Sequence, residues 1–389
     1  MGPGQGLLFA AYSFVSGREL WTLAPGGGVP TVAWDVIPGG AGSEPSELTT
    51  LAATVTGGAP AWLFAARIAD GAAPTLHAWS AGAGGLRCAL TLSTPVTMPL
   101  RPVVTAAGAF FVGTAVGASA PSVWLLPRGA LTASALCALQ GAPLPVSQPL
   151  PEVVPLSRVE HCGGKVVFLA RGVGADASSD DVGLYWLDAV GAAAYDTRFT
   201  PLPANAQPPA APAGDSLLPH PRCVAGRAVA FATAGGPVAL VAPSGATTLL
   251  TGDAAASAYA GAHALAAVGA DGGLCFVAEL AAPTLHGALL CWTPAGGLAE
   301  ARAGPTVDTP AVSWMLGTPA GRVFLPCYGP DGSGPHACAY SPASLSWAAT
   351  SGAALSYSSF TLAGEQLLFG AAQPGGAKPV LFASAPASA

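Results

Sequence analysis

The chain has 389 residues, of which 51% are hydrophobic and only 9% are charged, and its formal net charge is −6. The mean hydropathy of +0.52 is in the range of membrane proteins, but Gly, Pro or polar residues interrupt every apolar run before it reaches the ~18 residues of a membrane-spanning helix. The negative net charge and the lack of a basic cluster argue against nucleic acid and anionic membrane surfaces as partners.

Short apolar segments, separated by Gly- and Pro-rich turns, recur about every 45 to 65 residues along the whole chain, and such a period is typical of propellers and solenoids. A tight glycine turn such as Gly57-Gly58 or Gly163-Gly164 precedes most of them, because glycine adopts the positive φ that a two-residue hairpin requires. The most regular kind of segment predicts eight strands: Leu7–Tyr12, Ala61–Ala66, Ala109–Gly113, Val166–Ala170, Ala228–Ala232, Leu274–Ala278, Val323–Cys327 and Leu367–Gly370.

Three other kinds of segment complete each period. An inner strand such as Leu48–Ala52 comes before the regular strand, and a variable outer strand such as Leu86–Leu90 ends the unit. Between these two lies a strand with an aromatic residue: Leu20-Trp21, Ala78-Trp79, Val123-Trp124, Tyr185-Trp186, Cys291-Trp292 and Ala339-Tyr340. A four-stranded unit cannot bury both of its faces alone, so the units must pack on one another, and a ring of units leaves few free edges.

We therefore predict an all-β fold, a β-propeller of four-stranded antiparallel blades in a single domain over residues 1–389. The recurring aromatic residues are interpreted as core residues between blades rather than as platforms for sugars. The first unit lacks an inner strand and the last unit lacks an outer strand. This is the pattern expected if strands from both ends of the chain close the ring. Seven blades is the favoured number and eight is the alternative.

Two segments outside the regular strands have simple interpretations. Phe199–Pro212 is rich in Pro and Ala and is predicted to be a surface loop. Gly6–Tyr12 is apolar, but no positively charged segment precedes it, so we interpret it as a strand of the first repeat rather than as a signal peptide.

The opening repeat carries the most specific motif of the chain. Its apolar strand is followed by Gly17–Trp21 (Gly-Arg-Glu-Leu-Trp), then Asp35–Gly39, and then Ser43–Thr49. Over residues 6–49 it resembles the ELW-type repeat of propellers in secreted and bacterial surface proteins, although Thr22–Gly26 replaces the Asp-Gly-Thr that follows the Trp in that family. The resemblance implies a β-propeller, often outside the cell, without a shared catalytic residue.

The eight cysteines occupy related positions in successive units. Cys275 and Cys291 lie on adjacent predicted strands of one unit, where antiparallel pairing brings Cα atoms to about 4.5–5.5 Å. The corresponding strands of the next unit hold Cys327 and Cys338. The remaining pairs join successive units: Cys162 with Cys223 at glycine turns, and Cys88 with Cys137 on fourth strands.

We predict that these four pairs are disulfides, and therefore that the protein resides in an oxidising compartment, extracellular or at the cell surface. The alternative is that the cysteines are buried free thiols that pack as small apolar residues. No Cys-x-x-Cys or Cys-x-x-His spacing occurs, so no metal site is predicted from the cysteines.

Three local patterns could carry chemistry, and each has a simpler explanation. Gly214–Leu217 (Gly-Asp-Ser-Leu), with His220 nearby, matches the letters of a GDSL esterase, but it follows a Pro-rich loop in an all-β chain rather than forming a strand-to-helix turn with a base and an oxyanion hole. The group Asp176, Asp180 and Asp181 could offer oxygens to Ca²⁺, but its spacing does not match an EF-hand loop. Asp331 is interpreted as a turn residue.

The remaining titratable residues give no catalytic arrangement. His77 and His286 share the context Pro-Thr-Leu-His and are interpreted as equivalent strand positions. A glycosidase needs paired carboxylates, and nothing in the sequence aims two of the candidates at one point: Glu47, Glu152, Glu160 and Glu279. No catalytic, cofactor-binding or metal-binding residue is predicted, and no cofactor.

The functional prediction follows from these observations. With few charges, a repetitive apolar sequence and no catalytic constellation, we expect a non-enzymatic structural or interaction module, secreted or surface-displayed, that packs with protein partners or copies of itself into a filament, sheath or appendage. One alternative is a carbohydrate-binding or carbohydrate-active propeller with its site at the central mouth of the ring. Another is a cytosolic scaffold with free thiols.

Overall fold

The computed structural model divides the chain into two compact units, Gly2–Pro201 and Leu202–Ala389, the second of which also includes Met1. We call them the N-terminal unit and the C-terminal unit. The structure describes residues 7–13, 15–24, 29–81, 85–137, 143–150, 152–171, 182–189, 195–202, 221–224, 226–231, 238–250, 259–269, 272–280, 286–300, 307–308, 315–327, 336–341, 346–349, 360–363, 366–372 and 379–383.

The protein is all-β, and the prediction of repeated four-stranded antiparallel sheets is confirmed. The described residues form eight sheets, and every paired strand within them is antiparallel to its neighbour. Their helices are short: α1 (Ala53–Thr56), η1 (Arg128–Leu131) and α2 (Ala133–Leu136). None of the helices in the described part of the chain is long and apolar enough to cross a membrane.

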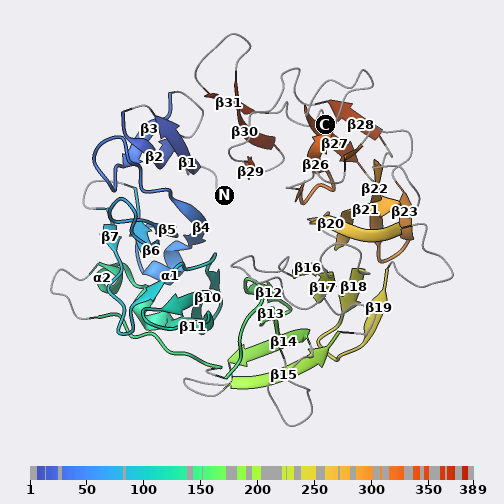
Figure 1. The fold of residues 1–389 in the computed structure, drawn as a ribbon, viewed down its shortest axis with the longest axis horizontal. Helices are drawn as coiled ribbons and strands as arrows, with labels where there is room; N and C mark the ends of the chain where they lie inside the picture. The colour runs from blue at the N-terminus through green and yellow to red at the C-terminus, as the bar shows by residue number, and fades with distance from the viewer. Residues whose placement is uncertain are drawn as a thin grey trace. The chain divides into compact units, whose positions relative to one another are not determined.

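The N-terminal unit holds four sheets that follow one another in chain order (Figure 1). The first contains β1 (Leu7–Ser13), β2 (Gly17–Leu23) and β3 (Thr31–Trp34), and the second contains β4 (Ser46–Leu51), β5 (Ala61–Ala66), β6 (Thr75–Trp79) and β7 (Arg87–Ala89). The third contains β8 (Val96–Thr97), β9 (Val103–Val104), β10 (Gly108–Ala115) and β11 (Ser122–Pro127), with β8 and β9 both paired to β10. The fourth contains β12 (Glu160–Cys162), β13 (Lys165–Arg171), β14 (Val182–Ala189) and β15 (Tyr195–Pro201).

The C-terminal unit repeats this order in four further sheets (Figure 1). The fifth sheet contains β16 (Arg222–Val224), β17 (Arg227–Phe231), β18 (Val238–Val241) and β19 (Thr247–Leu249), and the sixth contains β20 (Tyr259–Val268), β21 (Gly273–Leu280), β22 (His286–Thr293), β23 (Gly297–Glu300) and β24 (Val307–Asp308). The seventh contains β25 (Leu316–Gly317), β26 (Val323–Cys327), β27 (His336–Ser341) and β28 (Ser346–Ala349). The eighth contains β29 (Phe360–Ala363), β30 (Gln366–Ala372) and β31 (Pro379–Ala383).

The core lies between neighbouring sheets rather than inside any one of them. In the N-terminal unit, one apolar cluster joins the third sheet to the fourth and contains Phe110, Val112, Phe168 and Tyr185. Another cluster joins the second sheet to the third. Four of the predicted aromatic core residues are at most 5% exposed: Trp79, Trp124, Trp186 and Tyr340. The interpretation as core residues is therefore correct for these four, whereas Trp21 and Trp292 are only half-buried.

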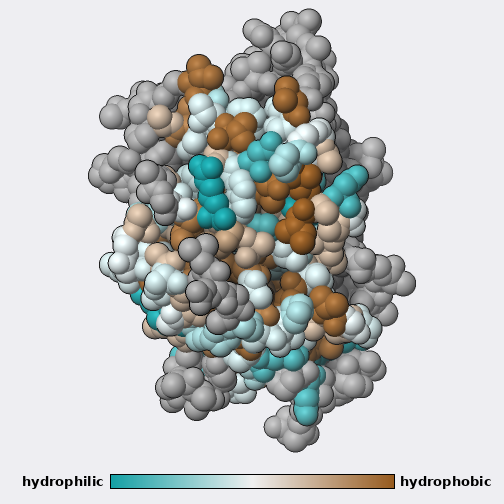
Figure 2. Space-filling view, turned by 90° about the vertical axis from the view of Figure 1, so that its left-hand side faces the viewer, coloured by the Kyte–Doolittle hydropathy of each residue, from teal (hydrophilic) through white to brown (hydrophobic). Residues whose placement is uncertain are grey.

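The charge-poor surface carries scattered apolar side chains. Figure 2 shows one side of the molecule, where hydrophobic residues in brown lie in separate groups among pale and teal residues. Among the described residues, Val15 is 84% exposed and Ile68 is 58% exposed. Single exposed apolar side chains are common on soluble proteins, so they give no support to the expected packing into a filament, sheath or appendage.

The motif of the opening repeat has a structural cause. Gly17 and Gly42 lie so close that a Cβ on Gly17 would meet the Gly42 backbone nitrogen at 2.5 Å. Glu19 is fully buried, and its carboxylate accepts hydrogen bonds from the backbone N–H of Ser43 at 2.7 Å and of Val36 at 3.1 Å, and from the Ser43 hydroxyl. Glu19 therefore fixes the loop that leads from the first sheet to the second.

Replacement of this carboxylate by an amide is expected to destabilise the protein. In Glu19→Gln, an NH₂ group replaces an oxygen that now accepts from N–H donors, so the free energy of unfolding should fall by about 2 kcal/mol. The matched control is Glu44→Gln, because Glu44 forms an ion pair at 3.4 Å with Arg18 in which both side chains are exposed (42% and 37%). This control should cost less than about 1 kcal/mol. Urea unfolding measures both, and equal losses would contradict the assigned role of Glu19.

Candidate functional site

The first strands of three consecutive sheets in the N-terminal unit are irregular at corresponding places. The pairing of β4 with β5 shifts register between Ser46 and Thr49. In the third sheet, residues 98–102 separate β8 from β9, although both pair with β10. In the fourth sheet, an isolated bridge from Pro155 to Ala170 precedes β12, and the chain between them holds more residues than the facing segment of β13. Each first strand therefore contains a bulge, and bulges redirect side chains.

The three bulges bring together Glu47, Arg101 and Arg158, which we call the bulge cluster. The Glu47 Oε1 atom lies 2.8 Å from Arg158 Nη2, and Glu47 Oε2 accepts a hydrogen bond of 3.0 Å from the backbone N–H of Arg101. The Glu47 side chain is 14% exposed and that of Arg158 is 38% exposed, while Arg101 is an exposed residue. A hydrogen bond of 2.8 Å from Thr49 Oγ1 to the carbonyl oxygen of Pro102 holds the neighbouring first strands together.

The backbone at the bulge cluster adopts a conformation that side chains disfavour. Glu47 has a φ of 58°, and Met98, in the next bulge, has a φ of 51°. Left-handed backbone at a residue other than glycine costs about 1–3 kcal/mol, persists only where the surroundings impose it, and concentrates at functional sites. Here the contacts of Glu47 with two neighbouring bulges supply that constraint.

The bulge cluster offers one guanidinium group to an anion. The Glu47 carboxylate contacts the Arg158 guanidinium and the backbone N–H of Arg101, in a protein whose net charge is −6. Guanidinium groups bind carboxylates and phosphates through paired hydrogen bonds. Because the Arg158 side chain is only partly covered, it can accept a second anionic partner beside Glu47.

The other carboxylates named from the sequence lie on other elements. Glu152 is exposed, Glu160 begins β12, and Glu279 lies in β21, where its side chain is outside the described residues. Within the described ranges, no group of three or more His, Cys, Asp or Glu residues is placed to hold a metal ion. Three further candidates lie outside the described residues: the Asp176, Asp180 and Asp181 group, the Gly214–Leu217 motif with His220, and Asp331.

The cysteines are paired as follows. Sulfur–sulfur bonds join Cys275 to Cys291, Cys327 to Cys338, and Cys88 to Cys137; Cys162 and Cys223 are disulfide-bonded as well. Cys275 lies directly opposite Cys291 in the pairing of β21 with β22. The expectation that Cys137 lies on a fourth strand is wrong, because it follows the helix α2, where the chain leaves the third sheet.

His77 is a core residue of the second sheet. It is 1% exposed, and its ring lies 5.5 Å from that of Phe64 and 5.6 Å from that of Trp34. Its Nε2 atom lies 3.1 Å from the carbonyl oxygen of Ala66, and because a carbonyl only accepts, this nitrogen carries the proton of the neutral ring. Burial lowers the pKa of His77 to about 4, against the small opposing effect of that hydrogen bond. The second histidine of the Pro-Thr-Leu-His pattern, His286, begins β22, and its side chain lies outside the described residues.

The burial of His77 predicts how stability depends on pH. Because its pKa is about 4 in the folded protein and the ordinary value for histidine is 6.5, the unfolded chain binds the proton more readily. The contribution of neutral His77 to the free energy of unfolding is therefore fully present above pH 6.5 and decreases as the pH falls toward 4. At pH 4 the protein should have lost about 3 kcal/mol of stability through this residue. Urea unfolding at several pH values should show that His77→Gln removes this part of the acid sensitivity, whereas parallel profiles of the two proteins would contradict it.

Comparison with known proteins adds the fold class. No protein-family model matches this chain, and no curated protein matches it. One similar solved structure is a serine-to-alanine mutant of puromycin hydrolase complexed with PGG, with a TM-score of 0.55 and 14% identity over 95% of this chain and 57% of that chain. A second is dipeptidyl peptidase 4 from Porphyromonas gingivalis, with a TM-score of 0.54 and 10% identity over 98% of this chain and 56% of that chain. A third is an oligogalacturonate lyase in complex with manganese, with a TM-score of 0.52 and 10% identity over 99% of this chain and 98% of that chain.

These structures contain β-propellers, so the repeated sheets of this chain belong to a propeller-like architecture. The chain spans little more than half of the hydrolase and of the peptidase, and almost all of the lyase. At 10–14% identity the likeness shows the fold alone. The described residues offer no cluster of carboxylate and histidine ligands of the kind that manganese prefers, so we assign no step to that metal.

The prediction of a non-enzymatic structural or interaction module is contradicted by this comparison, because the similar structures are hydrolases and a lyase. The prediction rested on the lack of a compact catalytic motif in the sequence. In repeated sheets, however, polar side chains meet from separate repeats, as those of Glu47 and Arg158 do. A search for short motifs cannot find such a group.

Proposed function

We propose that this chain is an enzyme-type β-propeller that binds an acidic oligosaccharide, one with uronate-like carboxylates, at the bulge cluster. The observation that carries the proposal is the contact of the strained Glu47 with the Arg158 guanidinium and the Arg101 backbone. A carboxylate of the substrate would bind Arg158 from its open side, beside Glu47. Glu47 would then lie next to the bound sugar as the carboxylate available for proton transfer.

The likeness to the oligogalacturonate lyase supports this choice of substrate. That lyase is matched over 98% of its length. An oligogalacturonate is a chain of carboxylates, which complements a partly exposed guanidinium group such as that of Arg158. Because that likeness concerns the fold, the assignment depends on the cluster and on the experiment below.

The architecture that we propose around this site is a single closed propeller over residues 1–389. Eight separate sheets among the described residues favour eight blades over seven. The first sheet has no strand that precedes β1, and the last has none that follows β31 within the described residues, which is compatible with closure by the two termini. In such a ring the first strands of the sheets line the central channel. The relation of the opening repeat to ELW-type propellers remains a prediction.

We also propose that the protein is secreted or displayed at the cell surface, where disulfides persist. Peptide mapping by mass spectrometry under non-reducing conditions should then recover four linked pairs: Cys88 with Cys137, Cys162 with Cys223, Cys275 with Cys291, and Cys327 with Cys338. Alkylation of the untreated protein should modify no cysteine. Recovery of eight alkylated thiols would contradict the proposed compartment.

The substrate proposal is tested by binding of oligogalacturonate, measured by isothermal titration calorimetry. Arg158→Gln should weaken binding about 10- to 100-fold, because it removes a charge-assisted hydrogen-bond donor. Glu47→Gln should tighten binding several-fold, because it removes the carboxylate that competes for Arg158, and should lower the release of unsaturated or reducing ends from the substrate. The matched control is Arg87→Gln, since Arg87 is an exposed arginine of β7 outside the cluster.

A chemical control separates charge from shape. Fully methyl-esterified oligogalacturonate has the same sugars without the carboxylates, and we expect it not to bind. Equal binding of ester and acid, or unchanged binding by a folded Arg158→Gln variant with native circular dichroism, would overturn the proposal. Turnover of neutral peptides with no binding of acidic sugars would assign the site to a different substrate class.

A further inference from the structure

Exposed aliphatic side chains gather at the end of the sheets that holds the bulge cluster. Strands β1, β5, β10 and β13 all finish at this end of the N-terminal unit. Most of the large apolar side chains that are exposed among the described residues of this unit lie here, and each of its four sheets contributes at least one. We call them the rim: Val15 (84% exposed), Ile68 (58%), Met98 (53%), Val116 (67%) and Val154 (37%).

Backbone hydrogen bonds join the rim ends of the first two sheets. The N–H of Glu44 donates a bond of 3.1 Å to the carbonyl oxygen of Arg18, just after the turn between β1 and β2. The N–H of Arg67, just after β5, donates a bond of 2.8 Å to the carbonyl oxygen of Ser43. The rim residues of these two sheets therefore lie at one common end.

Two rim residues belong to the segments that form the bulge cluster itself. Met98 begins the bulge of residues 98–102, whose backbone binds the Glu47 carboxylate. Val154 lies shortly before Arg158, in the segment of the fourth sheet that contacts the same carboxylate. Apolar surface therefore accompanies the guanidinium group on the strands that carry it.

The conformation of Met98 indicates that its exposure has a use. Met98 has a φ of 51°, in the left-handed region that glycine and asparagine adopt more easily than methionine does. Its side chain is 53% exposed, so little burial within the protein offsets that strain. Strained backbone of this kind concentrates at ligand sites, and the apolar side chain that it presents to solvent can gain contacts from a ligand.

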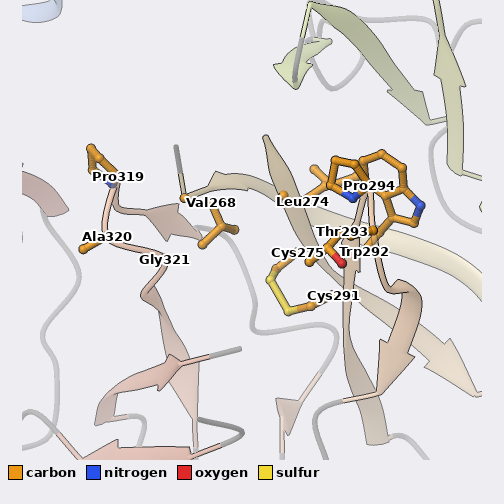
Figure 3. A pocket seen from close by; sticks show the side chains of 13 residues that line it. Val268, Leu274, Cys275, Cys291, Trp292, Thr293, Pro294, Pro319, Ala320 and Gly321 are labelled. Carbon is orange, nitrogen blue, oxygen red and sulfur yellow. A yellow bond between two sulfur atoms is a disulfide. The ribbon is translucent and has the colours of Figure 1, made fainter. Parts of the chain in front are cut away.

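The other end of the repeat has a different character in the C-terminal unit. There, the turns between β20 and β21 and between β25 and β26 border an open hollow (Figure 3). Its thirteen lining residues include no acidic or basic side chain. An acidic ligand therefore finds a charged partner at the bulge cluster and finds none in this hollow.

We propose that the ligand of the bulge cluster is a partly esterified acidic oligosaccharide. One free carboxylate binds Arg158, and the uncharged methyl esters of the neighbouring sugars pack on Met98 and Val154. Each methyl group that an aliphatic side chain removes from water strengthens binding about fourfold, whereas a carboxylate in the same place would lose hydration without gaining a partner. This inference rests on the function proposed above and narrows its substrate class.

The test compares two trisaccharides by isothermal titration calorimetry with the full chain. One is trigalacturonate with three free carboxylates, and the other has methyl esters on both outer sugars and a free carboxylate on the central one. The native protein should bind the diester about tenfold more tightly than the triacid, because two methyl groups gain apolar contacts.

Variants of the rim show whether this preference comes from Met98. Met98→Asn should reduce the ratio of the two affinities about fourfold, and because asparagine tolerates left-handed backbone, the variant should fold. Met98→Leu keeps an aliphatic side chain and should preserve the ratio. The matched control is Val32→Ser, which changes a 41% exposed valine of β3 outside the rim and should also preserve it.

The outcomes separate this inference from the proposed function. Equal affinity of the native protein for the two trisaccharides would overturn the inference, as would an unchanged ratio in a Met98→Asn variant with native circular dichroism. Either result leaves the proposed function standing if Arg158→Gln still weakens the binding of both ligands. Binding of neither trisaccharide by the native protein would overturn the proposed function together with the inference.

Discussion

The structure depends on one constraint: a strand that is apolar on both faces is stable only where its sheet packs against neighbouring sheets. Strand β13 shows this most directly, because every residue from Val166 to Ala170 is at most 1% exposed, whichever way its side chain points. A strand with one solvated face would alternate apolar and polar residues. Continuous apolar strands therefore require stacking of the sheets, and the apolar clusters lie between successive sheets.

The same constraint explains the unusual composition. Where both faces of every sheet are buried, small and medium apolar residues fill the strands, and charges are left to turns and strand ends. A chain with 9% charged residues is then compatible with a propeller-like fold without any partner to cover its surface. The expectation of assembly into a filament or sheath treated this composition as evidence of an external interface, whereas the internal interfaces between sheets account for it.

In such a fold, few positions are available for polar side chains that form a functional site. The middle strands of each sheet are fixed by hydrogen bonds on both sides, but the first strand has a neighbour on one side only and can bulge without breaking the sheet. In the N-terminal unit three first strands do so, and the Glu47 carboxylate meets the Arg158 guanidinium and the Arg101 backbone N–H there. In the C-terminal unit the first strands β20 and β25 meet closely instead, at Ala267 and Gly317.

The sequence by itself determined the repeat, the strand type and the buried aromatic positions, because apolar runs of fixed period with glycine turns and one aromatic residue per unit are local properties. It also brought out the motif around Glu19, whose role in holding the loop to Ser43 needed only nearby residues. The tertiary structure alone decided where Glu47, Arg101 and Arg158 meet, because bulges shift the register of each first strand by amounts that no local pattern encodes. It also decided that Cys137 follows a helix rather than lying on a fourth strand.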